Sequence, residues 1–161
     1  MHTRHRIEAL RARMEERKLE ALLIAEPSNR RYISGFTGTS GYVLITMDRA
    51  VLFTDFRYMT QAAAQCPDLE VIRHKADYLA SIKPELEKSG IKRLGFEQNH
   101  TAYGDYRKYA AELNPIELVP VENLTEELRM KKDESELAII RQAARLADQA
   151  FEHILPYIRP G

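Results

Sequence analysis

Residues 35–41, Gly-Phe-Thr-Gly-Thr-Ser-Gly, combine three glycines and three hydroxyl side chains in seven positions. Closely spaced glycines let backbone N–H groups approach an anion, so phosphate binding is the first chemistry to consider. A phosphate loop opens a helix, whereas residues 42–46 are β-branched and aromatic and predict a strand. No Lys-Ser or Lys-Thr pair follows Gly41 either. The sequence therefore argues against a phosphate cradle, and a plain turn between a short helix and a strand stays open as an interpretation.

The other reactive side chains form no recognisable catalytic set. The five histidines are His2, His5, His74, His100 and His153. His2 and His5 can share a helix face but have no acidic or thiol partner nearby, and no His-Glu-x-x-His sequence occurs. The single cysteine, Cys66, has no adjacent base, and no Gly-x-Ser-x-Gly sequence occurs. We therefore predict no catalytic residue and no metal ligand in this chain.

Two carboxylates stand at the ends of predicted strands. Asp55 also begins a helix, where it can accept backbone N–H groups and meet the positive end of the helix dipole. This structural role is favoured over catalysis, and Arg57 and Tyr58 are expected to brace the neighbouring turn. Glu97 ends a strand at a position where open α/β sheets often bind ligands. A single carboxylate without a partner is weak evidence, so a structural role is favoured here too.

The elements that position these residues alternate between helix and strand. Apolar residues at helical spacing predict helices over 3–18, 28–34, 55–66, 78–88 and 103–113, with Ser28 or Asn29 capping the second. Short apolar or β-branched runs predict strands over 21–25, 41–47, 50–54, 69–73, 92–97 and 116–119. Residues 41–47 and 50–54 read as a hairpin. The order predicts an α/β fold, a three-layer mixed sheet flanked by helices on both faces.

From Val121 onward only helical patterns occur. One apolar stripe at steps of three or four residues comprises Leu137, Ile140, Ala144, Ala147, Phe151, Ile154 and Ile158. Asp133 and Glu136 can cap the start of this helix, and Pro156 can kink or end it. We predict an α/β domain over 1–121, a linker over 122–132, and over 133–161 a C-terminal helix that opens a second, truncated domain. The alternative is that the stripe packs back on the α/β domain.

Composition excludes several classes of function. The 161 residues suit one domain, or one domain and a piece of another. Lys plus Arg and Asp plus Glu both number 24, so no net field favours nucleic acid or an anionic membrane. The apolar runs are far shorter than a membrane span, and the charged N-terminus has no signal core. With a single cysteine, we expect a soluble cytoplasmic protein without nucleic-acid or membrane partners.

Four blocks follow one another along nearly the whole chain: NRRYISGFTGTSG, AVLFTDFRYMTQA, IKRLGFEQNHTAYGDY and ELRMKKDESELAIIRQAARLADQAF. In order and spacing they resemble the N-terminal part of bacterial Xaa-Pro peptidases, the aminopeptidase P and prolidase members of the creatinase-like metallopeptidases. The resemblance implies a small α/β domain before a catalytic domain of the pita-bread fold. That domain binds two divalent ions (Mn, Co or Zn) through two Asp, one His and two Glu. Its first helix resembles residues 133–158, and all five ligands would lie beyond Gly161.

The resemblance also implies roles for individual residues. In relatives the Gly-rich loop approaches the catalytic cleft of its own or a neighbouring subunit and helps to limit substrate length. The corresponding substrate-facing residues here are Phe36, Thr37, Gly38, Thr39 and Ser40. The glycines would keep the loop low and mobile, and its hydroxyls would meet a peptide end. Asp55, Arg57 and Tyr58 match a block that is taken as scaffold.

The function implied by the resemblance is that of a non-catalytic N-terminal domain in an Xaa-Pro dipeptidase or aminopeptidase. The parent protein would hydrolyse the bond before proline in Xaa-Pro peptides. This chain would be inactive alone, would carry no cofactor, and would contribute substrate gating and the contacts of a homodimer. The alternative from another class is a free-standing α/β module that binds a peptide or protein without hydrolase activity.

Overall fold

The computed structural model describes residues 3–161, and His2 therefore lies outside the described residues. The chain divides between Leu128 and Arg129 into two compact units. The first unit holds the sheet and the helices that cover it, and the second holds a long helix.

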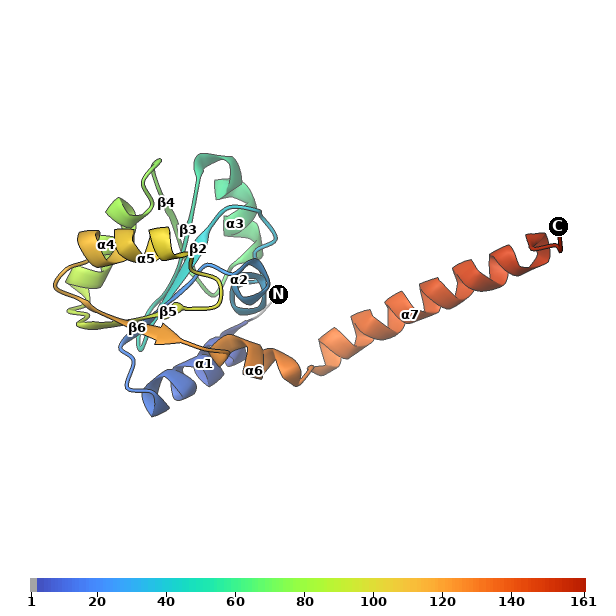
Figure 1. The fold of residues 1–161 in the computed structure, drawn as a ribbon, viewed down its shortest axis with the longest axis horizontal. Helices are drawn as coiled ribbons and strands as arrows, with labels where there is room; N and C mark the ends of the chain where they lie inside the picture. The colour runs from blue at the N-terminus through green and yellow to red at the C-terminus, as the bar shows by residue number, and fades with distance from the viewer. Residues whose placement is uncertain (1–2) are drawn as a thin grey trace. The chain divides into compact units, whose positions relative to one another are not determined.

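One six-stranded mixed sheet forms the centre of the first unit, in the order β4-β3-β2-β1-β5-β6 (Figure 1). Its strands are β1 (Ala21–Ile24), β2 (Tyr42–Thr46), β3 (Ala50–Thr54), β4 (Glu70–Arg73), β5 (Arg93–Glu97) and β6 (Glu117–Val121). β2 pairs antiparallel with β1 and β3, which confirms the predicted hairpin. The other pairs, β1–β5, β3–β4 and β5–β6, are parallel. Within residues 3–161, β2 is therefore the one strand that runs against the rest.

Helices cover both faces of this sheet (Figure 1). They are α1 (Arg4–Glu16), α2 (Pro27–Ser34), α3 (Met59–Gln65), α4 (Leu79–Lys88), α5 (Tyr103–Glu112) and α6 (Leu124–Met130). Buried side chains of α1, α2, α3 and α6 pack together on one face, and those of α4 and α5 on the other. β1 is buried throughout because Leu22 and Ile24 join the first cluster while Ala21 and Leu23 join the second. The predicted three-layer α/β fold is confirmed.

The ends of two helices differ from simple expectation. α2 begins one residue before the predicted helix, with Pro27 in its first turn, and its N-cap is Glu26. The Glu26 carboxylate accepts from the backbone N–H of Asn29 at 2.6 Å, so the prediction of Ser28 or Asn29 as cap was wrong. The helix after β3 begins as a short 3₁₀ segment, η1 (Phe56–Tyr58), before α3.

Residues 122–132, expected as a linker, contain α6, and its Leu124 and Thr125 are buried in the first unit. The second unit consists of α7 (Glu134–Ile154) and the 3₁₀ segment η2 (Leu155–Tyr157). α7 starts with a complete capping box, in which Asp133 accepts from the Glu136 N–H and the Glu136 side chain accepts from the Asp133 N–H. Its regular helix ends just before Pro156, which lies within η2.

Candidate functional site

The direction of the strands brings several loops to one edge of the sheet. Because β2 is antiparallel to its neighbours, its amino end lies beside the carboxyl ends of β1 and β3. The Gly-rich loop, residues 35–41, precedes β2 and therefore lies at this edge, which we call the carboxyl edge. In open α/β sheets, ligands bind in the crevice outside the carboxyl ends of strands. The carboxyl edge is therefore the candidate site.

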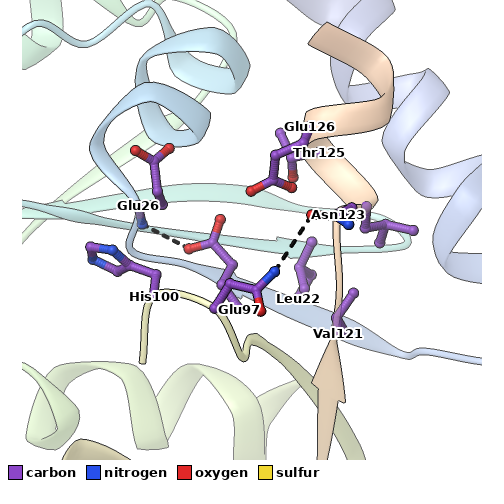
Figure 2. Close-up of a pocket in the computed structure, with 10 residues that line it drawn as sticks. Leu22, Glu26, Glu97, His100, Val121, Asn123, Thr125 and Glu126 are labelled. Atoms are coloured by element: carbon purple, nitrogen blue, oxygen red, sulfur yellow. Dashed lines mark hydrogen bonds between the residues drawn. The ribbon is translucent and has the colours of Figure 1, made fainter. Parts of the chain in front are cut away.

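Glu97, the last residue of β5, joins three elements at the carboxyl edge. Its Oε2 accepts from the backbone N–H groups of Ala25 and Glu26, both at 2.7 Å, and its Oε1 accepts from Nδ2 of Asn29 at 2.8 Å. Figure 2 shows the bond to the Glu26 N–H. Burial raises the pKa of the Glu97 carboxyl, and these N–H donors oppose that shift. Both oxygens are engaged by the protein itself, so Glu97 holds the β1–α2 turn in position.

A pocket of about 100 Å³ lies beside Glu97, and we call it the glutamate pocket (Figure 2). Its polar lining residues include Glu26, Glu97, Asn99, His100, Asn123 and Glu126. Asn29 lies between two of the carboxylates, because its Nδ2 also donates to Oε1 of Glu126 at 2.7 Å. No group of three or more His, Cys, Asp or Glu side chains in residues 3–161 is arranged to hold a metal ion.

The side chain of Arg30 makes hydrogen bonds to the backbone of the Gly-rich loop. This side chain, on α2, is 4% exposed. Its Nη2 donates to the carbonyl oxygen of Gly38 and its Nη1 to that of Gly41, both at 2.8 Å. The hydroxyl of Thr54, at the end of β3, donates to the carbonyl oxygen of Ser40 at 2.7 Å. The loop is thus more constrained than its glycine content suggests.

Phe36 and Gly38 form the base of the loop. The Phe36 side chain is buried, and the Tyr58 ring meets it edge-on with centroids 5.7 Å apart. Gly38 lies directly on the Phe36 ring, since a Cβ at position 38 would fall 2.2 Å from Cζ of Phe36. Because the ring is buried, a larger residue at position 38 would require the loop to move.

The two threonines of the loop are exposed and point to different partners. The Thr37 N–H donates to Oε1 of Gln65 at 3.0 Å, and its hydroxyl accepts from Nε2 of Gln61 at 2.9 Å, so this residue is bound to α3. The hydroxyl of Thr39 lies 2.8 Å from that of Tyr58. Of the predicted substrate-facing residues, Thr39 and Ser40 line a second pocket at the carboxyl edge.

That second pocket, which we call the loop pocket, has a volume of about 300 Å³. Besides Thr39 and Ser40 it is lined by the side chains of Arg30, Tyr42, Tyr78, His100, Thr101, Asp105 and Tyr109, among others. These residues come from α2, β2, α5 and the segments that precede α4 and α5. The loop pocket is therefore assembled by distant parts of the chain that meet at the carboxyl edge.

Three tyrosines form one wall of the loop pocket. The rings of Tyr42 and Tyr78 are stacked, with centroids 4.0 Å apart and an angle of 13° between their planes. The hydroxyl of Tyr78 donates to that of Tyr109 at 3.4 Å. Burial raises the pKa of each of the three phenols above its ordinary value. All three hydroxyls therefore stay protonated at neutral pH and can donate hydrogen bonds.

Asp55 and Arg57 form a closed pair at the start of η1. Oδ1 of Asp55 accepts from the backbone N–H and Nε of Arg57 at 3.0 and 2.9 Å, and its Oδ2 accepts from Nη2 at 2.8 Å. The hydrogen-bonded Arg57 guanidinium holds the pKa of the Asp55 carboxyl well below its usual range. Asp55 thus caps η1, while the next residue, Tyr58, contacts the loop through Phe36 and Thr39.

The thiol and most histidines lie away from these pockets. Cys66 is buried, and burial raises the pKa of its thiol to about 11, which keeps it protonated and unreactive at neutral pH. His100 is the histidine that lines both pockets among the described residues.

Several residues of the loop pocket were not predicted as site residues. Arg30, Tyr42, Tyr78 and Asp105 are far apart in the sequence. Arg30 and Asp105 fall within two of the four blocks, but the resemblance implies no role for either. Three of them share one signal: Tyr78 directly precedes α4, Tyr42 begins β2, and Asp105 lies in the first turn of α5. Polar or aromatic residues at such starts of elements are the side chains that a parallel arrangement brings to the carboxyl edge.

The family model of the Creatinase/Prolidase N-terminal domain matches residues 6–131. The chain belongs to this family. Among curated relatives, the uncharacterized peptidase YqhT of Bacillus subtilis is 42% identical over 156 residues, which is 97% of this chain and 44% of YqhT. The resemblance inferred from the sequence blocks is confirmed.

Solved structures of this family have the same fold. The Xaa-Pro dipeptidase from Bacillus anthracis superposes with a TM-score of 0.93 at 39% identity, over 99% of this chain and 45% of the dipeptidase. The N-terminal domain of the cytoplasmic peptidase PepQ from Mycobacterium tuberculosis gives a TM-score of 0.71 at 37% identity, over 77% of this chain and 98% of that domain. The chain therefore spans less than half the length of YqhT and of the Bacillus anthracis enzyme. None of the helices described is long and apolar enough to cross a membrane.

Proposed function

We propose that this chain is the non-catalytic N-terminal domain of an Xaa-Pro metallopeptidase that hydrolyses the bond before proline. The observation that carries the proposal is the superposition on the Bacillus anthracis dipeptidase, which uses 99% of this chain but 45% of the enzyme. The remainder of such an enzyme would supply the catalytic domain, and α7 would be its first helix.

The two divalent ions of the parent enzyme (Mn, Co or Zn) are assigned to that remaining part. The absence of a metal-holding group of carboxylates, histidines or cysteines within residues 3–161 supports this assignment. Metal bound there would supply an activated water at neutral pH. The residues of the present chain would then contact and orient the substrate without taking part in bond cleavage.

The Gly-rich loop is proposed to border the catalytic cleft and to limit substrate length. Three contacts support a rim of fixed shape: the bonds of Arg30 to two loop carbonyls, that of Thr54 to Ser40, and that of Tyr58 to Thr39. Thr39, which is exposed, and Ser40 would offer hydroxyls to a peptide end. The packing of Gly38 on the Phe36 ring would fix how far the loop projects. Asp55, Arg57 and Tyr58 would form the scaffold of the loop.

We also propose a cellular location and an assembly state for the parent enzyme. A cytoplasmic location is proposed because the Mycobacterium tuberculosis relative is named a cytoplasmic peptidase. A homodimer is proposed as well, in which this domain would contribute contacts between subunits.

Assays of the purified chain test whether metal binding and hydrolysis require the remaining part of the enzyme. We expect calorimetric titration with Mn²⁺, Co²⁺ and Zn²⁺ to give no tight binding, and Xaa-Pro peptides to remain intact with each ion. A stoichiometric sub-micromolar site, or metal-dependent cleavage by this chain alone, would overturn the proposal.

A further inference from the structure

The amide side chain of Asn29 contacts carboxylates from two different elements. Asn29 lies near the start of α2 and is fully buried. Its Nδ2 donates to Oε1 of Glu97 on β5 at 2.8 Å and to Oε1 of Glu126 on α6 at 2.7 Å. We call this arrangement the Asn29 bridge. Through one nitrogen atom it connects α6 to the sheet.

The two carboxylates of the Asn29 bridge lie close to each other. Each has an oxygen within hydrogen-bond distance of the same nitrogen, and Figure 2 shows both side chains directed into the glutamate pocket. Glu97 is buried and Glu126 is half-buried, so water and salt screen their repulsion less than they would at the surface. Two ionised carboxylates that share a site repel each other, and a proton on one of them removes the repulsion.

Other titratable groups near Glu97 belong to elements other than α6. The carboxylate of Glu26 and the imidazole of His100 line the same pocket. Arg30 on α2 and Tyr109 on α5 also interact electrostatically with Glu97. All four stay near Glu97 when α6 alone opens. The charge that such an opening removes from the pocket is that of Glu126.

The pKa of Glu97 couples this carboxyl to the position of α6. Burial raises the pKa, and the nearby charge of Glu126 adds to this rise, while the N–H donors of Ala25, Glu26 and Asn29 lower it. Opening of α6 would expose Glu97 to water and remove Glu126, but would leave those donors in place. Glu97 therefore binds its proton more tightly with α6 packed than with α6 open. By linkage, the proton favours the packed position.

We propose that the Asn29 bridge is an attachment of α6 that acid strengthens: α6 packs more firmly when the carboxylates of Glu97 and Glu126 share a proton, and opens more readily when both are ionised. α7 follows α6 along the chain. One consequence rests on the proposed function, in which α7 is the first helix of the catalytic domain. The pH would then alter how firmly the connection to that domain is held.

Hydrogen exchange of the chain at about pH 5 and about pH 8 tests the proposal. The rate of each backbone amide in residues 127–130 is compared with that of an unprotected amide at the same pH, which gives a protection factor free of the intrinsic pH effect. The amides of Leu22 and Leu23, in a strand paired on both sides, report unfolding of the whole domain. We expect the α6 amides to exchange faster than these, and their protection to be at least about threefold higher at the lower pH.

Glu126→Gln is the decisive variant, because it keeps an oxygen that accepts from Asn29 and removes the charge. We expect it to raise the protection of α6 at about pH 8 at least about threefold, and to reduce the difference between the two pH values to less than about twofold. Glu127→Gln, a half-buried change of the same charge on the same helix, is the matched control and should respond like the native chain. His100→Gln, an exposed change in the pocket, should also keep the native response.

Four results would overturn the proposal. Protection of α6 that is equal at both pH values, or that falls on acidification, would show no strengthening by acid. A native response in Glu126→Gln, or a response lost in His100→Gln, would assign the effect to another group. Exchange of the α6 amides as slow as that of β1 would exclude a separate opening of α6. The measurement involves no hydrolysis, so this proposal and the proposed function fail separately.

Discussion

The guanidinium of Arg30 donates from Nη2 to the carbonyl oxygen of Gly38 at 2.8 Å, in the middle of the Gly-rich loop. Its Nη1 reaches Gly41 at the end of the same loop, also at 2.8 Å. One buried side chain on α2 therefore fixes the backbone that carries Thr39 and Ser40. The shape of the candidate site therefore depends on the contacts of Arg30.

Arg30→Met should destabilise the chain while keeping a side chain of similar length. Two buried carbonyl oxygens lose their donors at about 1–3 kcal/mol each. Removal of a buried charge partly offsets this loss, so we expect a net loss of about 1–3 kcal/mol. Urea unfolding measures the change. Arg31→Met, at an exposed neighbouring position of α2, is the control and should stay within about 0.5 kcal/mol. Equal stability of both variants would mean that Arg30 does not hold the loop.

Gly38→Ala should destabilise the loop through its contact with Phe36. The added Cβ would lie 2.2 Å from Cζ of the buried ring, and overpacking of this kind costs about 1–3 kcal/mol. Gly104→Ala is the matched control, because nothing lies within 4 Å of a Cβ at that position of α5 and alanine favours helix. We expect a lower melting temperature for the first variant and an equal or higher one for the second. The reverse order would contradict the described packing.

Glu97→Gln should change how stability depends on pH. Burial raises the pKa of the Glu97 carboxyl in the folded chain, so the folded state binds this proton at a higher pH than the unfolded chain does. The stability of the native chain, relative to the variant, should therefore rise as the pH falls through the folded pKa and level off below the unfolded pKa. Urea unfolding between about pH 8 and about pH 4 covers this window.

Glu87→Gln is the exposed control for this pH series. A relative stability that falls on acidification would show the opposite balance, in which the N–H donors of Ala25, Glu26 and Asn29 outweigh burial and favour the carboxylate.

The chain should self-associate through α7. Its apolar stripe includes Leu137, Ile140, Phe151 and Ile154, each of which gains roughly 1.5–3 kcal/mol when fully buried. The same stripe on a second copy is a ready partner, and a two-fold dimer is the simplest closed arrangement. Analytical sedimentation gives the mass of the native chain in solution. The same measurement is made on a version that ends at Met130 and on the double variant Ile140→Glu, Phe151→Glu. A monomeric native chain, or a dimer that survives both changes, would refute this contact.

The order of elements could be predicted from the sequence because it depends on local patterns. β3 has the predicted bounds, residues 50–54, and the capping residues Asp133 and Glu136 act as the spacing indicates. The cap of α2 could not be predicted, because Ser28 is a commoner capping residue than Glu26 and nothing local reveals that the Glu26 carboxylate reaches Asn29.

The candidate site could be predicted only where it is continuous in sequence. The loop was found through its glycines and hydroxyls. Arg30 and Asp105, which line the same pocket as Thr39 and Ser40, were not found, because they come to one edge only when the parallel strands place the starts of α2 and α5 there. Phe36 shows the same limit, since its apolar ring suits either a substrate contact or the buried position that it occupies.

Substitution of Thr39 and Ser40 by alanine in the complete encoded protein should alter peptide hydrolysis without unfolding the domain. Thr39 is exposed and Ser40 is half-buried, so we expect the loss of stability to stay at about 1 kcal/mol or less. If they border the cleft, kcat or KM should change, and the change should differ between dipeptides and longer substrates. Tyr58→Phe, which removes only the hydroxyl facing Thr39, is the control for loss of that one bond. Unchanged kinetics for every substrate length would leave the loop as a turn.

Hydrolysis of Xaa-Pro peptides by the complete product of the encoding gene tests the central claim most directly. We expect cleavage of the bond before proline that requires Mn²⁺, Co²⁺ or Zn²⁺, is abolished by a chelator, and is absent from residues 1–161 alone. A complete product that binds peptides but leaves Xaa-Pro bonds intact with every ion would contradict the account and favour a free-standing binding module.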